Sequence, residues 1–142
     1  MKKAFGLFTI ILSFALVIGC ESNKNSENKV ICIGSEDDTK QIMTGTFEND
    51  KLVKIVREEQ TTYDNDEDLN NEYSMSNTLI EYLNNTVDGI DAKVSKDGMT
   101  VTIKATMDMK KLDKNYKEDN NLNISTVLEF KDMAKLDGLT CD

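Results

Sequence analysis

Apolar and polar side chains alternate without a break across residues 99–107. The apolar members are Met99, Val101, Ile103, Ala105 and Met107, and every residue between them is threonine or lysine. Successive side chains of a strand point to opposite faces, so this pattern predicts a strand with one face on a core and the other in water. A strand of that kind is typical of an antiparallel sheet that is covered on one side only.

Upstream of this strand, the apolar residues follow a helical period. The members of the repeat, at three- and four-residue steps, are Leu69, Tyr73, Ser76, Ile80, Leu83 and Val87. They predict a helix of about 20 residues with one face towards the core. Asp64 or Asp66 is expected to cap its N-terminus, and residues 88–89 to end it. Tyr82 lies off the stripe and is expected to be exposed, where it would mark a contact surface.

The other segments complete the sheet and add a second helix. Strands are expected over residues 30–34, 39–48, 51–63 and 92–95, with a turn at residues 49–50. The apolar residues of the third strand do not alternate cleanly, which indicates a β-bulge. Thr126 and Glu129 form a capping-box pattern that predicts a helix ending near Asp137. Residues 114–123 are expected to form a polar loop.

These elements predict a single α+β domain over residues 30–142. Strand–helix–strand units do not repeat, so the sheet is expected to be antiparallel, with about four to five strands. The long helix and the C-terminal helix would cover one face of it. A last strand-like segment at residues 139–141 would lie beside the first strand.

The first twenty residues predict export and lipid attachment. Lys2 and Lys3 precede an apolar run over residues 4–18, and Gly19 stands before Cys20. The run is shorter than the roughly 20 apolar residues of a membrane-spanning helix, and the pattern is typical of a bacterial lipoprotein signal peptide over residues 1–19. Cleavage would leave Cys20 to carry a diacylglyceryl anchor at the extracytoplasmic face of the cell membrane, followed by a flexible stalk over residues 20–29. A signal cut elsewhere would leave an ordinary secreted protein.

The charge of the chain excludes some partners. Without Lys2 and Lys3, the 17 basic side chains become 15 against 26 acidic ones, a net charge of −11. A nucleic-acid-binding protein needs a basic face, so we expect no nucleic-acid partner. The same charge argues against electrostatic adhesion to anionic lipid headgroups and is expected to hold the domain off the membrane.

Two cysteines remain once Cys20 is assigned to lipid. Cys32 and Cys141 stand near opposite ends of the domain, and an exported chain can form disulfides. Pairing them would close a loop of about 110 residues. The alternative is two buried free thiols.

Three aspartates in the segment 64–68 resemble the start of a calcium loop. Asp64, Asp66 and Asp68 occupy its first three ligand positions, but Leu69 stands where glycine is needed and Met75 where glutamate is needed. Helix capping by a solvated acidic turn is the favoured interpretation. A weak calcium site is the alternative, and we predict no cofactor.

The sequence contains no pattern for a known catalytic centre. Histidine is absent, which excludes nucleophile–histidine pairs and histidine metal ligands, and there is no glycine-rich phosphate loop. We therefore expect a non-enzymatic binding or assembly module. The alternative from another class is an envelope hydrolase that uses acidic residues alone, which would require two buried, facing carboxylates.

Three segments carry a resemblance to a known family. They are FENDKLVK at residues 47–54, NTVDGID at residues 85–91, and the stretch from VTI at residues 101–103 to MKKL at residues 109–112. Over residues 39–112 and the signal peptide, the chain resembles the YehR-like lipoproteins, a family of unknown function. The resemblance implies a small α+β lipoprotein and carries over no catalytic or binding residue. The Cys32 and Cys141 pair departs from the family pattern, which leaves open how the edge strands pair.

Overall fold

A computed structural model describes residues 27–142 as six strands and three helices. The strands are β1 (Glu27–Glu36), β2 (Thr39–Glu48), β3 (Lys51–Thr62), β4 (Ile90–Asp97), β5 (Thr100–Asp108) and β6 (Thr140–Cys141). The helices are α1 (Asp66–Thr86), α2 (Lys114–Asp119) and α3 (Val127–Leu136). The predicted α+β class is confirmed, and β6 lies beside β1 as expected for the segment 139–141. The short helix α2 is added to the expected elements. None of the helices in residues 27–142 is long and apolar enough to cross a membrane.

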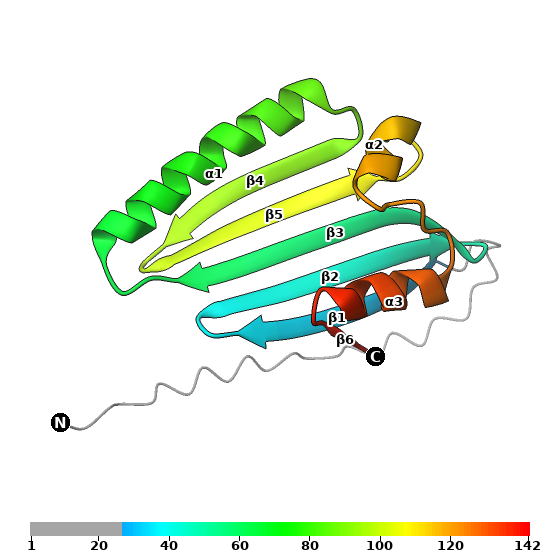
Figure 1. Ribbon diagram of the computed structural model, residues 1–142, viewed down its shortest axis with the longest axis horizontal. Helices are drawn as coiled ribbons and strands as arrows, with labels where there is room; N and C mark the ends of the chain where they lie inside the picture. Colours follow the sequence, from blue (N-terminus) through cyan, green and yellow to red (C-terminus); the bar gives the residue numbers. More distant parts are fainter. Residues whose placement is uncertain (1–26) are drawn as a thin grey trace, which may run out of the picture.

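All strand pairs in the sheet are antiparallel, in the order β4-β5-β3-β2-β1-β6. The register places Met43, Ile55 and Met107 on one face of the sheet, where core residues gather. Helix α1 runs along β4 at one edge, and α3 lies over β1 and β2 towards the other (Figure 1). Both helices cover the same face, so the single covered face that the sequence predicts is confirmed.

The core under α3 depends on a close approach between helix and sheet. Phe130 and Ala134 of α3 are fully buried, and Phe130 lies above Gly45 of β2. A Cβ atom at Gly45 would lie 2.9 Å from Cζ of Phe130, so only glycine lets the ring approach this closely. The helix begins with the predicted capping box, because Thr126 and Glu129 each bond the backbone N–H of the other.

Helix α1 buries the stripe that its period predicts, with Leu69, Ser76 and Ile80 turned towards β4 and β5. Its N-cap differs from the prediction. Asn65 caps the helix instead of Asp64 or Asp66, since its Oδ1 accepts the N–H of Asp68 at 2.9 Å while its Nδ2 donates to the Asp68 carboxylate at 2.7 Å. An amide makes both bonds at once, whereas a carboxylate can only accept.

Two further segments also differ from the sequence prediction. The segment expected to be a polar loop contains α2, a two-turn helix whose N-cap Asp113 accepts the N–H groups of Asn115 and Tyr116. Strand β1 begins at Glu27, so residues 27–29 belong to the sheet and not to the stalk. The predicted bulge is confirmed on β3, where the register shifts after the pairing of Thr46 with Lys54.

Candidate functional site

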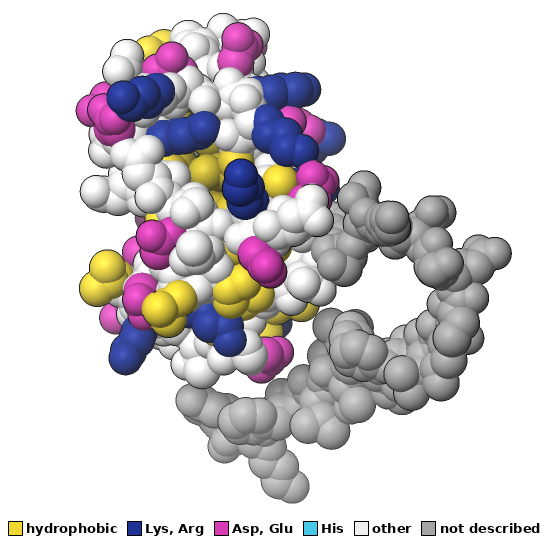
Figure 2. All heavy atoms as spheres, turned by 90° about the vertical axis from the view of Figure 1, so that its right-hand side faces the viewer, with side chains coloured by type: hydrophobic (Ala, Val, Ile, Leu, Met, Phe, Trp, Pro, Cys, Tyr) yellow, Lys and Arg dark blue, Asp and Glu magenta, His cyan; other side chains and the backbone are white. Residues whose placement is uncertain are grey.

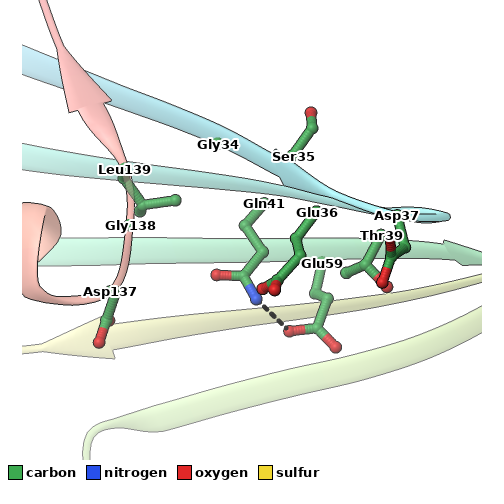
Figure 3. A pocket seen from close by; sticks show the side chains of 10 residues that line it. All are labelled: Gly34, Ser35, Glu36, Asp37, Thr39, Gln41, Glu59, Asp137, Gly138 and Leu139. Atoms are coloured by element: carbon green, nitrogen blue, oxygen red, sulfur yellow. Dashed lines mark hydrogen bonds between the residues drawn. The ribbon is translucent and has the colours of Figure 1, made fainter.

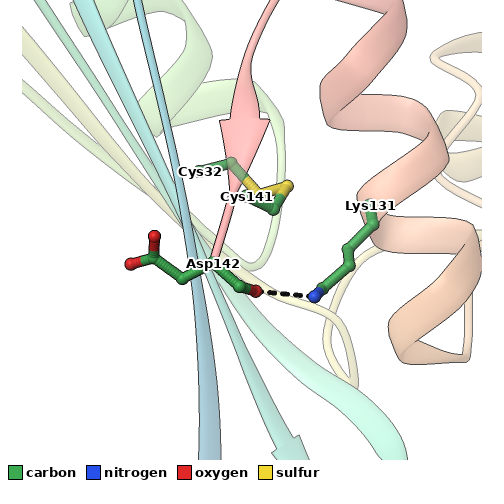
Figure 4. The surroundings of a disulfide bond; sticks show 4 residues. All are labelled: Cys32, Lys131, Cys141 and Asp142. Carbon is green, nitrogen blue, oxygen red and sulfur yellow. Dashed lines mark hydrogen bonds between the residues drawn. A yellow bond between two sulfur atoms is a disulfide. The ribbon is translucent and has the colours of Figure 1, made fainter.

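The two cysteines of the domain form a disulfide between β1 and the edge strand β6 (Figure 4). Strand β6 pairs with β1 so that Cys141 stands opposite Cys32, and Cys32 is fully buried. Beside this bridge, the Lys131 ammonium donates to the backbone oxygen of Asp142 at 2.6 Å. The pairing of Cys32 with Cys141 expected from the sequence is therefore present, and it fixes the C-terminus to the first strand. Cys20, the predicted lipidation site, lies outside the described residues.

The three aspartates considered for calcium are all exposed at the start of α1. Asp66 and Asp68 belong to the first helical turn, where carboxylates favour the positive end of the helix dipole. Asp68 is also held by Asn65. Within residues 27–142, no group of three potential ligands is placed to hold a metal ion. Asp66 and Asp68 therefore favour the start of the helix, and Asp64 precedes its N-cap.

A polar pocket of about 380 Å³ opens where β1 turns into β2. Figure 3 shows the side chains of Glu36, Gln41 and Glu59 turned towards one another, with a 3.1 Å hydrogen bond from Gln41 to Glu59. Asp137 borders the pocket and pairs with Arg57 at 3.4 Å. Over residues 28–142 the buried polar side chains are Thr46 and Ser76 alone, so no carboxyl group there is buried as the hydrolase hypothesis requires.

A second cavity, of about 650 Å³, runs between α3 and the uncovered middle of the sheet. Its floor consists of Met43, Ile55 and Met107, and α3 contributes Met133 and Leu136 to its wall. The rim carries polar and charged groups, among them Arg57, Asn120, Asn121, Glu129, Asp132 and Asp137. The volume is in the range of small-ligand sites, and an apolar floor with a few polar groups at the rim is typical of ligand pockets.

The outer side of α1 carries an apolar stripe that no other element within residues 27–142 covers. Met75, Leu79 and Tyr82 lie at spacings of four and three residues, and each has 58–69 % of its surface exposed. They line one shallow depression with Glu72 and Thr78. We call these three residues the α1 stripe. When a helix has a second apolar face, that face is typically covered by another part of the protein or by a binding partner.

The sequence pattern predicted only part of the α1 stripe. It predicted that Tyr82 would be exposed, and the structure confirms this. It did not single out Met75 or Leu79, because the stronger stripe through Leu69 and Ile80 accounts for the core-facing side. The signal that would have found them is the i, i+4, i+7 spacing that leads from Met75 to Tyr82.

Comparisons with known proteins support the architecture. The chain is similar to the NMR structure of the E. coli YehR protein, with 16 % identity and a TM-score of 0.65 over 82 % of this chain and 91 % of that one. It is also similar to the NMR structure of a protein from Streptococcus pneumoniae TIGR4, with 15 % identity and a TM-score of 0.58 over 99 % of this chain and 100 % of that one. No family model and no curated protein matches the chain. The domain therefore has a YehR-like fold.

Proposed function

We propose that this chain is a YehR-like envelope lipoprotein, anchored by lipid on Cys20, whose domain is a non-enzymatic binding module. The signal-like pattern before Cys20, the YehR-like fold and the disulfide support this proposal, since disulfides form in exported proteins. No carboxylate in residues 28–142 is buried, which favours binding over acid–base hydrolysis.

The α1 stripe is the observation that carries the binding role. Three large apolar side chains stand together in water on a helix whose other face already covers the sheet. The charged residues of α1 are all acidic, namely Asp66, Glu67, Asp68, Glu72 and Glu81. The complementary partner is a protein whose contact surface is apolar and flanked by basic side chains.

Site-specific photocrosslinking in intact cells tests this role. A benzophenone amino acid in place of Leu79 is expected to capture one protein partner, because Leu79 is the middle residue of the α1 stripe. The matched control replaces Leu128 of α3, which is also exposed but stands outside the stripe. The purified partner should bind the chain less tightly as salt rises, since its basic side chains would face the acids of α1.

Two outcomes would contradict the binding role of α1. One is the absence of an adduct at Leu79 in cells that express the chain at its normal level. The other is the same set of adducts at Leu79 and Leu128, which would indicate collision instead of recognition. A Met75→Gln and Tyr82→Gln double variant should abolish the adduct at Leu79 while the domain keeps its thermal stability.

A further inference from the structure

The path of the chain into the fold determines which end of the domain lies near an anchor on Cys20. Strand β1 begins at Glu27, opposite Glu48 and beside the turn between β2 and β3. The seven residues from Cys20 to Glu27 span at most about 25 Å when fully extended. This inference rests on the proposed anchoring at Cys20, which would hold the β2–β3 turn within that distance of the membrane surface.

Exposed lysines gather at this end of the domain. They are Lys29 and Lys51 at the starts of β1 and β3, Lys54 of β3, and Lys110, Lys111 and Lys114 around the start of α2. Figure 2 looks at this end and shows dark blue side chains around an apolar centre in the upper half of the domain. We call these six residues the lysine end. The neighbouring Lys117 turns inward instead, and its ammonium donates to the Met109 carbonyl at 2.6 Å.

Three lysines of this end form ion pairs, and in each pair the lysine is the more exposed partner. The pairs are Lys110 with Glu48 at 2.9 Å, Lys111 with Asp108 at 3.9 Å and Lys114 with Glu118 at 3.5 Å. The lysine side chains are 66–84 % exposed, and their carboxylate partners are 41–49 % exposed. At each of these three pairs, an approaching anionic surface therefore meets the ammonium group before its carboxylate partner.

Other carboxylates lie at the same end but do not change this order. Asp113 accepts two backbone N–H groups as the cap of α2, so its charge is directed into the helix. Asp50, Asp88, Asp91 and Asp119 are exposed at this end as well, so its local net charge is slightly negative. Binding of an anionic surface at this end is therefore expected to depend on the positions of the charged side chains and not on net charge. It is also expected to weaken as the salt concentration rises.

The acidic side chains concentrate at the opposite end of the strands. Glu36 ends β1, residues 37–38 connect it to β2, and residues 64–68 lead into α1; all their carboxylates are exposed. A strand of ten residues, such as β1, spans about 33 Å, several times the Debye length of about 8 Å at physiological salt. The negative charge at the far end is therefore screened from a membrane that faces the lysine end. Repulsion inferred from the total charge does not apply to this orientation.

We infer that the lysine end is the membrane-facing surface of the anchored domain and binds anionic phospholipid headgroups. Lys110, Lys111 and Lys114 supply the ammonium groups that contact the phosphates. The far end, with the acidic residues, then points away from the membrane. The α1 stripe runs between the two ends and stays open to a partner.

Energy transfer to labelled lipid tests this orientation. The chain from Cys20 to Asp142 contains every described strand and helix, and with Cys32 and Cys141 in a disulfide its single thiol is Cys20. That thiol can be coupled to a maleimide lipid in vesicles that also carry a dansyl lipid. The natural chain has no tryptophan, so an Asn115→Trp variant near the lysine end and an Asn71→Trp variant on α1 near the far end each supply one donor.

The vesicle composition separates headgroup binding from simple tethering. With about 30 % phosphatidylglycerol, transfer from the Asn115→Trp variant should rise about twofold over pure phosphatidylcholine, and about 0.5 M NaCl should remove the rise. Transfer from the Asn71→Trp variant should stay low in both. Equal transfer in the two vesicle types, or an equal rise for both donors, would overturn the inference.

A charge-matched pair of variants locates the contact. Replacing Lys110, Lys111 and Lys114 with glutamine should abolish the rise that phosphatidylglycerol causes. Replacing Lys40, Lys96 and Lys135 with glutamine removes the same charge at the far end and should leave the rise intact. Equal losses in both variants would overturn the inference. Because coupling to Cys20 is chemical, this result is independent of whether cells lipidate the chain, which the mass of the cellular protein reports separately.

Discussion

The ring of Phe130 packs edge-on against the ring of Phe47, with centroids 5.8 Å apart and planes at 83°. Both side chains are fully buried, and Gly45 leaves the space above β2 that the Phe130 ring occupies. Edge-to-face pairs are favourable beyond the area that they bury. This contact joins α3 to the sheet and forms one wall of the core beside the apolar cavity.

Gly45→Ala is expected to destabilise the domain by about 1–3 kcal/mol, because the new methyl group would press against the Phe130 ring. Thermal unfolding monitored by circular dichroism measures the effect. Gly98→Ala is no suitable comparison because Gly98 has a positive φ, so Ser35→Ala, at an exposed strand residue, serves as the control. A Gly45→Ala protein as stable as the control would show that the approach of Phe130 is not tight.

Loss of the disulfide should lower the free energy of unfolding by about 4–5 kcal/mol in the chain-entropy model, since the bridge spans 109 residues of sequence. Denaturant unfolding of the oxidised chain and of a Cys141→Ser variant measures this difference. Thiol labelling of the unreduced, natively folded domain should modify neither Cys32 nor Cys141. Free labelling of both residues would contradict the bridge.

The capping box of α3 should make the domain less stable to unfolding at acid pH. The backbone N–H groups of Ser125 and Thr126 donate to the Glu129 carboxylate and lower its pKa from 4.5. A lowered pKa in the folded state means that the contribution is present above about pH 4.5 and is lost as the pH falls through the folded pKa. Urea unfolding should show Glu129→Gln less stable than wild type near pH 7, with the gap closing near pH 3. A gap that stays constant with pH would contradict this role.

Asn65→Ala should destabilise the domain by about 1 kcal/mol, because it removes the cap of α1. Asp64→Ala should change the free energy of unfolding by less, since Asp64 precedes the cap and is exposed. Chemical unfolding of the two variants side by side checks the comparison. Equal losses would favour the capping role that the sequence assigned to an aspartate.

Periodicity was sufficient to predict most of this fold. The sheet and α1 each bury one face. The alternation over residues 99–107 indicates the buried face of the sheet, and the repeat from Leu69 to Val87 indicates that of α1. Helix α2 escaped prediction because its six residues bury no side chain and so leave no stripe. Strand β6 has only two residues, and its place depends on the disulfide to β1 instead of on a pattern of its own.

The candidate surfaces were harder to predict than the fold. The cavity beside α3 combines Met43, Ile55 and Met107 from three strands, and only the sheet register brings them together. The lysine end likewise joins β1, β3 and the segment around α2, which are distant in sequence. Total charge predicts repulsion from membranes, but it carries no information on where the charges lie, and the vesicle experiment separates that expectation from the proposed orientation.

The mass of the protein recovered from cell membranes tests the central claim most directly. We predict a chain that begins at Cys20 and carries a diacylglyceryl group, and a Cys20→Ala variant that is neither cleaved there nor acylated. An unmodified chain of 142 residues in the cytosol would contradict the anchoring and the orientation derived from it.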